Sequence, residues 1–363
     1  MGLKSENQRK AAKPLRIGFV PLCDCAPLII AQELGLFGRY GLRVELSREI
    51  GWATLRDKIL YGELEAAHAL APMVFAATLG LDSPPVDCLT GLVLNLHGNA
   101  ITVAEQWFDE RKGGEDWQQS LARRDRFILG IPFLHSSHQF IARAWLRTLV
   151  PRAERIAQFV VVPPPQMPAN LKAGHLDGYC VGEPWNSVAA LAGFGRIVAT
   201  SAEIAPLHPE KVLMVRRSFA EERAEEHEQL IAALIAACRF CDAPQNREQV
   251  IETLARGQYL NTSAAALRAG LTGDMARKSG IIRQKDFTIF ARDNANEPSG
   301  RKAAWILENF RQAGICKDAS VLSFALARKV FRADLFERAL RLANPVANND
   351  QHEIESNKTT VLA

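Results

Sequence analysis

Short apolar runs of strand length recur along the chain, and stretches with helical periodicity lie between them. We predict strands at residues 15–22, 42–46, 66–70, 88–94, 100–104, 127–132, 159–162, 178–181 and 212–215. The predicted helices between them cover residues 26–37, 54–61, 139–149 and 166–173. Such repeated alternation of strand and helix is typical of a layered α/β fold.

The pattern becomes mostly helical after residue 215. Helices are predicted at residues 221–240, 247–254, 263–271, 302–313 and 334–342. A polar stretch at residues 106–126 interrupts the earlier alternation and indicates a crossing or an insertion. Residues 344–363 are polar, and we expect them to be disordered.

Two segments of the chain resemble each other, residues 59–72 (ILYGELEAAHALAP) and residues 171–184 (LKAGHLDGYCVGEP). The matching positions pair Gly62 with Gly174, Leu64 with Leu176, Glu65 with Asp177 and Pro72 with Pro184. Each segment reads as a helix end, a glycine cap, an acidic turn and a buried strand. We interpret them as equivalent parts of two lobes, although chance similarity in a common connection would give the same short pattern.

The predicted organisation has four parts. They are a flexible N-terminus (1–14), a first lobe (15–104 plus 208–343), a second lobe (105–207) and a disordered tail (344–363). The composition agrees with a globular protein, because 48% of the 363 residues are hydrophobic and 23% are charged. The apolar runs end well short of the roughly 20 residues that a membrane helix needs. The net charge of +4 is too small to indicate direct binding of nucleic acid.

The sequence shows no signature of metal, cofactor or covalent chemistry. The seven cysteines lack the spacing of a disulfide scaffold or a zinc ribbon, and Cys238 and Cys241 are interpreted as structural. Glycine-rich phosphate loops and hydrolase motifs are not found. We therefore expect no metal, no cofactor and no enzymatic activity. Residues 1–14 lack the apolar stretch of a secretory signal, so we expect a cytoplasmic protein.

Ligands of open α/β sheets bind where strands end and helices begin. Trp52 follows a predicted strand and precedes residues 54–57, which have capping-box spacing, so it is expected at a helix N-terminus. His138 falls in the first turn of a helix that Ser136 and Gln139 would cap. Free backbone amides at such positions favour an anion. Each residue could instead be an ordinary core or structural side chain.

Further candidates lie at other strand ends. Asn99 occupies a turn between two predicted strands, and Lys211 directly precedes another. Pro72, Gly182 and Glu183 follow predicted strands and could line the same cleft. The alternatives are an asparagine that suits a turn, a solvated surface lysine and a glutamate that caps a helix.

Five segments, in this order, resemble the nitrate/bicarbonate solute-binding family of ABC importers. They are GWATLRD (51–57), APM (71–73), VPPPQM (162–167), VGEPW (181–185) and HPEK (208–211). The resemblance implies a bilobed fold of the type II periplasmic-binding-protein kind, with an oxyanion in the cleft.

The resemblance also assigns roles to residues. Nitrate-binding members use a tryptophan, a histidine and a lysine that match Trp52, His138 and Lys211, while Asn99 stands where they have a glutamine. Asparagine is one methylene shorter. Bicarbonate-binding relatives carry an acidic residue at the position of Lys211, which can accept the bicarbonate proton. The lysine here therefore points to nitrate or nitrite.

The family that this sequence resembles has a cytosolic branch, the NasS-type nitrate/nitrite sensors. These hold an RNA-binding antiterminator of the NasT type and release it when the ligand binds. Together with the expected cytoplasmic location, this predicts a sensor that touches neither RNA nor a membrane itself. The alternatives are the substrate-binding component of an ABC importer, an enzyme like those of thiamine-pyrimidine synthesis, and a domain that is normally fused to a transporter ATPase.

Overall fold

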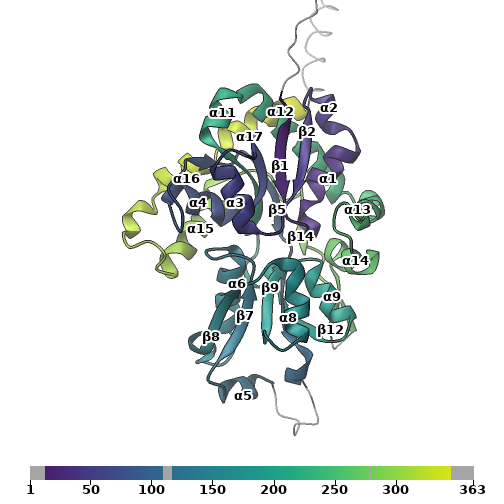
Figure 1. The fold of residues 1–363 in the computed structure, drawn as a ribbon, viewed down its shortest axis with the longest axis vertical. Helices are drawn as coiled ribbons and strands as arrows, with labels where there is room; N and C mark the ends of the chain where they lie inside the picture. The colour runs from purple at the N-terminus through teal and green to yellow at the C-terminus, as the bar shows by residue number, and fades with distance from the viewer. Residues whose placement is uncertain (1–12, 109–116, 278–279, 345–363) are drawn as a thin grey trace, which may run out of the picture.

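The computed structural model describes residues 13–108, 117–277 and 280–344, and they form two α/β lobes stacked along the long axis (Figure 1). The first-lobe sheet has seven strands, in the order β14 (Thr288–Ile289), β5 (Val93–His97), β11 (Pro209–Arg216), β3 (Ala66–Leu70), β1 (Leu15–Phe19) and β2 (Val44–Arg48), with β4 (Cys88–Leu89) paired to β11. The second-lobe sheet has five, in the order β10 (Gly195–Thr200), β6 (Asn99–Ala104), β9 (Gly178–Gly182), β7 (Phe127–Ile131) and β8 (Ala157–Val161). The predicted bilobed α/β fold is confirmed.

Helices cover both sheets. Those of the first lobe are α1 (Ala26–Glu33), α2 (Leu36–Arg39), α3 (Trp52–Leu60), α4 (Ala71–Leu79), α11 (Arg217–Glu222), α12 (Ala224–Asp242), α13 (Arg247–Ala255), α15 (Gly300–Gln312), α16 (Phe324–Val330) and α17 (Ala333–Ala343). Those of the second lobe are α5 (Trp117–Ala122), α6 (Ser137–Arg147), α7 (Ala153–Ile156), α8 (Met167–Lys172), α9 (Trp185–Leu191) and α10 (Ser201–Ile204). Short 3-10 turns are η1 (Cys23–Cys25), η2 (Glu105–Phe108), η4 (Pro164–Gln166), η5 (Pro244–Asn246) and η6 (Ala319–Val321).

Apolar cores lie on both faces of the first sheet, because side chains alternate along each strand. In β11, Leu213 and Val215 pack with α1 and α12, whereas Val212 and Met214 pack with α3, α4 and α15. Each described helix is too short or too polar to cross a membrane.

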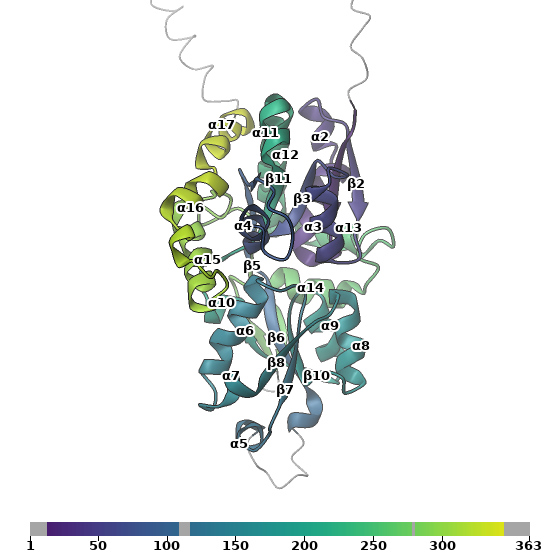
Figure 2. The same ribbon diagram turned by 60° about the vertical axis from the view of Figure 1, so that its left-hand side comes forward.

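The chain crosses between the sheets from β5 to β6 and returns from β10 to β11. At the first crossing His97 and Gly98 have φ values of 60° and 94°, the left-handed region that glycine tolerates best. Helix α14 (Ala264–Thr272) lies across the junction of the lobes (Figure 2). In both sheets the parallel strands end at this junction.

The two similar segments have the same local geometry. The Glu65 carboxylate accepts a hydrogen bond from the backbone N–H of Arg16 in β1 at 2.8 Å. The Asp177 carboxylate accepts one from the backbone N–H of Ile128 in β7, also at 2.8 Å. The glycine three residues before each acid has a φ of 77°. Each acid thus fixes the end of the neighbouring strand in its own lobe.

Several predicted boundaries were wrong. The helix predicted at 26–37 divides into α1 and α2, because Gly35 adopts a φ of 64°. The strand predicted at 88–94 divides into β4 and β5. Helix α3 begins at Trp52 with Gly51 as its N-cap, so residues 54–57 form no capping box.

The hairpin of β12 (Asp274–Arg277) and β13 (Gly280–Arg283) packs against β10 and α9 of the second lobe, although residues 208–343 were assigned to the first. The polar stretch 106–126 contains the end of η2 and helix α5, and its residues 109–116 lie outside the described residues. The predicted flexible N-terminus and disordered tail also lie outside, apart from residues 13, 14 and 344.

Candidate anion-binding site

The structure brings the four predicted ligand-binding residues together at the junction of the lobes, where all four are buried. Trp52 is the first residue of α3, and the ring of Trp52 lies 5.4 Å from Lys211 Nζ. His138 lies in the first turn of α6, and Asn99 begins β6. The predicted cap of α6 is confirmed, since Ser136 Oγ accepts a hydrogen bond from the backbone N–H of Gln139.

Two of these positions differ from their expected settings. Asn99 lies in a strand, opposite Gly182 of β9, and not in a turn. Lys211 lies inside β11 and is fully buried, so the reading of a solvated surface lysine was wrong.

A carboxylate that the sequence analysis did not single out, that of Glu210, contacts three of the four residues, Asn99, His138 and Lys211. Glu210 accepts hydrogen bonds from Asn99 Nδ2 at 2.6 Å, Ser137 Oγ at 2.5 Å and Lys211 Nζ at 2.8 Å. His138 Nε2 lies 3.7 Å from Glu210 Oε1. The carboxylate thus accepts hydrogen bonds from Asn99 and Lys211, two side chains that were predicted to donate to the anion.

A second carboxylate completes the network. Lys211 Nζ donates to Asp24 Oδ2 at 2.7 Å, and His68 Nε2 lies 3.1 Å from Asp24 Oδ1. An aspartate between a strand and a helix is typical of a helix cap, but α1 has Cys25 as its N-cap and no side-chain cap. Its position in the sequence could have indicated a site residue, because Asp24 follows the end of β1 as Trp52 follows the end of β2.

The charges of this network depend on one another. Burial alone would lower the pKa of Lys211, but the carboxylates of Asp24 and Glu210 raise it above its ordinary value. Burial would raise the pKa of both carboxyl groups, but Lys211 holds each pKa below its ordinary value. Burial lowers the pKa of His138 to about 4, so its ring is neutral at neutral pH.

Unpaired donors face this network. Trp52 Nε1 and both ring nitrogens of His138 are buried and have no hydrogen-bond partner among the described residues. Buried polar groups normally have partners, so at the junction of the lobes these atoms are available to a ligand. Among the described residues, no group of histidine, cysteine and acidic side chains is arranged to hold a metal ion.

The three residues proposed as cleft lining have different positions. A Cβ atom at Gly182 would lie 3.4 Å from Asn99 Oδ1 and 3.5 Å from Asp24 Oδ2, so Gly182 lines the network. Glu183 is buried, and its backbone carbonyl accepts a hydrogen bond from the N–H of Cys23 at 2.7 Å. Pro72 lies in the first turn of α4.

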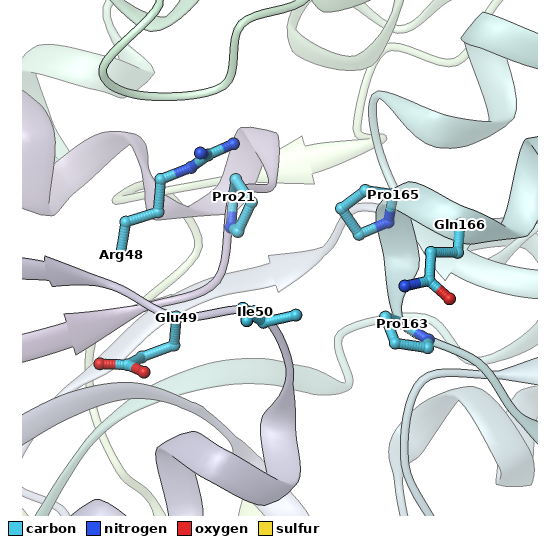
Figure 3. A pocket seen from close by; sticks show the side chains of 7 residues that line it. All are labelled: Pro21, Arg48, Glu49, Ile50, Pro163, Pro165 and Gln166. Atoms are coloured by element: carbon cyan, nitrogen blue, oxygen red, sulfur yellow. The ribbon is translucent and has the colours of Figure 1, made fainter.

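A pocket of about 350 Å³ lies between the lobes next to the site. Figure 3 shows its walls, with Pro21, Arg48, Glu49 and Ile50 facing Pro163, Pro165 and Gln166. The first wall is close to the site along the chain, since Pro21 comes three residues before Asp24 and Ile50 two residues before Trp52.

Comparison with known proteins identifies relatives over most of the chain. Residues 8–255 match the NMT1-like family. The nitrate import ATP-binding protein NrtC of Synechocystis is 34% identical over 94% of this chain, which spans 52% of that protein's length. The nitrate/nitrite binding protein NrtA of Nostoc is 30% identical, over 90% of this chain and 76% of that protein. The chain thus covers about half of the ATP-binding relative but most of the binding protein.

The solved structures agree with the sequence comparison. The crystal structure of the periplasmic nitrate-binding protein NrtA from Synechocystis superposes with a TM-score of 0.85 at 26% identity, covering 92% of this chain and 90% of that one. Its fold is the bilobed one described above. On the family match, the chain belongs to the NMT1-like family, and it is similar over most of its length to nitrate-binding proteins.

Proposed function

We propose that this protein binds nitrate or nitrite between its lobes and acts in the cytoplasm as a sensor, not as an enzyme. In this proposal it holds an RNA-binding antiterminator of the NasT type and releases it when the anion binds. The observation that carries the binding step is the buried ammonium of Lys211, set beside the unpaired donors of Trp52 and His138. The sensor step rests on the resemblance of the sequence motifs.

The chemistry of the site suits a small, flat monoanion. Nitrate carries one charge and three coplanar acceptors and has no donor, so it needs several N–H groups and a cation. Taking an anion out of water is costly unless it is paired and hydrogen-bonded. Trp52, His138 and Lys211 can supply that set. Competition between nitrate, nitrite and bicarbonate in calorimetry tests the choice, and tighter binding of bicarbonate would contradict it.

The indole N–H of Trp52 gives a direct test of the binding step. Trp52→Phe keeps an aromatic ring in the core but removes the donor, and a hydrogen bond to a charged partner contributes about 1.5–3 kcal/mol. We expect nitrate affinity, measured by calorimetry, to fall about tenfold to a hundredfold. Trp107→Phe is the matched control, because Trp107 Nε1 is also buried without a described partner but lies in η2, outside the site. Unchanged affinity in Trp52→Phe would contradict the assignment.

Release of a partner requires that nitrate bind the free protein better than the complex. An anion with equal affinity for both forms would release nothing. Every group of the network is buried, so binding involves opening and closing of the lobes. A regulator that held the lobes apart would compete with the anion.

A pull-down tests the sensor step. The tagged full-length protein should retain a NasT-type regulator from a nitrate-free lysate and lose it when nitrate is added. Lys211→Met, which lacks the countercharge, should retain the regulator in both conditions if the variant is folded. Retention by the unaltered protein with nitrate present would contradict release by the ligand.

The alternative role is the substrate-binding component of an ABC importer, to which the nitrate-binding relatives point. The same anion-binding site would serve an importer component. Cell fractionation distinguishes the two roles, since protein recovered with the periplasm favours the importer.

A further inference from the structure

The buried network carries more negative than positive charge. Asp24 and Glu210 contribute two carboxylates, and Lys211 contributes one ammonium, which leaves a net charge of −1 while the histidines are neutral. A bound monoanion would bring this sum to −2. An uncompensated charge in a buried site is costly, so a bound anion calls for another positive charge.

The contact between His208 and Glu210 offers a place for that charge. His208 Nδ1 lies 2.8 Å from the carbonyl oxygen of Ala205, which can only accept, so Nδ1 carries a hydrogen. His208 Nε2 lies 3.3 Å from Glu210 Oε2, which accepts as well when ionised. A hydrogen bond between these two atoms therefore requires a second proton, held on the ring or on the carboxyl group.

We propose that each anion binds together with one proton, held between His208 and Glu210, and that this pair restricts the site to monoanions. This inference rests on the proposed anion binding. A dianion such as sulfate would need two compensating protons. Among the described residues of the network, one contact between an imidazole and a carboxylate still needs a proton, that of His208 with Glu210. His208 and Glu210 act here through charge and need not touch the ligand.

Other titratable groups face this pair from the surrounding elements. They are Asp24 of η1, His68 of β3, His97 of β5, His138 of α6, Cys180 of β9 and Lys211 of β11. Burial keeps the pKa of both His68 and His138 low, and it raises the pKa of Cys180.

His97 is fixed by its two neighbours. Its Nδ1 lies 2.9 Å from the carbonyl oxygen of Asp286, and its Nε2 accepts the backbone N–H of Leu207 at 2.6 Å. A ring that donates on one side and accepts on the other has no place for a second proton. His68 needs one hydrogen, because its Nε2 lies 3.1 Å from Asp24 Oδ1 and its Nδ1 has no partner in the described part of the chain. Of the described histidines in this network, His208 is thus the one whose contacts call for two protons.

The direction of the pH effect follows from linkage. A bound anion stabilises the extra proton, so the pair holds it to higher pH in the complex than in the free protein. Nitrate affinity should then increase as pH falls, by about tenfold for each pH unit, in the range where only the complex holds the proton.

Calorimetry on the full chain tests this inference. Nitrate is titrated between pH 6 and 8.5, at each pH in two buffers with different heats of ionisation, and the difference gives the number of protons taken up. We expect up to about one proton per nitrate, and no competition by sulfate. Glu210→Gln should take up no proton and should bind nitrate more tightly than the unaltered protein at pH 8.5. The exposed His175 provides the control, since His175→Gln should keep the proton uptake.

The outcomes separate the two proposals. Nitrate binding without proton uptake at any pH would overturn the proton coupling and leave the proposed function intact. Absence of nitrate and nitrite binding at every pH would overturn both. The measurement on the unaltered protein is decisive even if Glu210→Gln does not fold.

Discussion

Replacing Lys211 with methionine is expected to abolish nitrate binding and to lower the free energy of unfolding by about 3–5 kcal/mol. The ammonium donates to Asp24 at 2.7 Å and to Glu210 at 2.8 Å, and all three groups are buried. Methionine keeps most of the volume but leaves two carboxylates facing each other without a cation. Denaturant unfolding at pH 7 measures the stability, and calorimetry measures the binding.

A double variant separates the two effects of this substitution. Asp24→Asn combined with Lys211→Met returns the net charge of the network to −1, with Glu210 as the remaining carboxylate. We expect the double variant to recover much of the lost stability but none of the nitrate affinity. Nitrate binding by either variant would show that Lys211 is not the countercharge.

The positions of Trp52 and His138 could be predicted because the relevant signals are local. Each residue follows an apolar run of strand length and precedes a helical pattern, and strand ends meet at one edge of a sheet. Such local patterns do not predict which side chain of a distant segment will lie against a given residue. The partner of Asp24 lies 187 residues away along the chain, and an aspartate between a strand and a helix is equally typical of a helix cap.

Glu210 shows a second limit of sequence patterns. In a regular strand, neighbouring side chains point to opposite faces, so Glu210 and Lys211 would not be expected to meet. The pairing of β11 with β5 changes register on both sides of Lys211. Such an irregularity redirects side chains and lets the two neighbours form an ion pair. His68 was missed because it lies within an apolar strand, where a single polar residue is easily taken for a residue of the core.

Glutamine at position 183 is expected to stabilise the protein at pH 8 by up to about 3 kcal/mol and to have little effect near pH 4.5. Burial raises the pKa of Glu183 from 4.5 to about 7, although Ser187 donates its backbone N–H to the carboxylate at 3.1 Å. Glu183 Oε1 has no hydrogen-bond partner in the described part of the chain. The folded protein therefore prefers the neutral carboxyl group.

The sign follows from the raised pKa of Glu183. The folded state holds this proton between pH 4.5 and 7 and the unfolded state does not, so the stability from this group is complete below pH 4.5 and is lost as pH rises through 7. Glutamine stays neutral, so the variant does not lose stability as the pH rises, and its carbonyl can still accept the hydrogen bond from the backbone N–H of Ser187.

Denaturant unfolding of both proteins at several pH values measures the difference in the free energy of unfolding. Glu154→Gln is the control, because a hydrogen bond from Arg147 lowers the pKa of Glu154, and it should give no gain at pH 8. A gain for Glu183→Gln that did not change with pH would show that packing, and not the buried charge, is responsible.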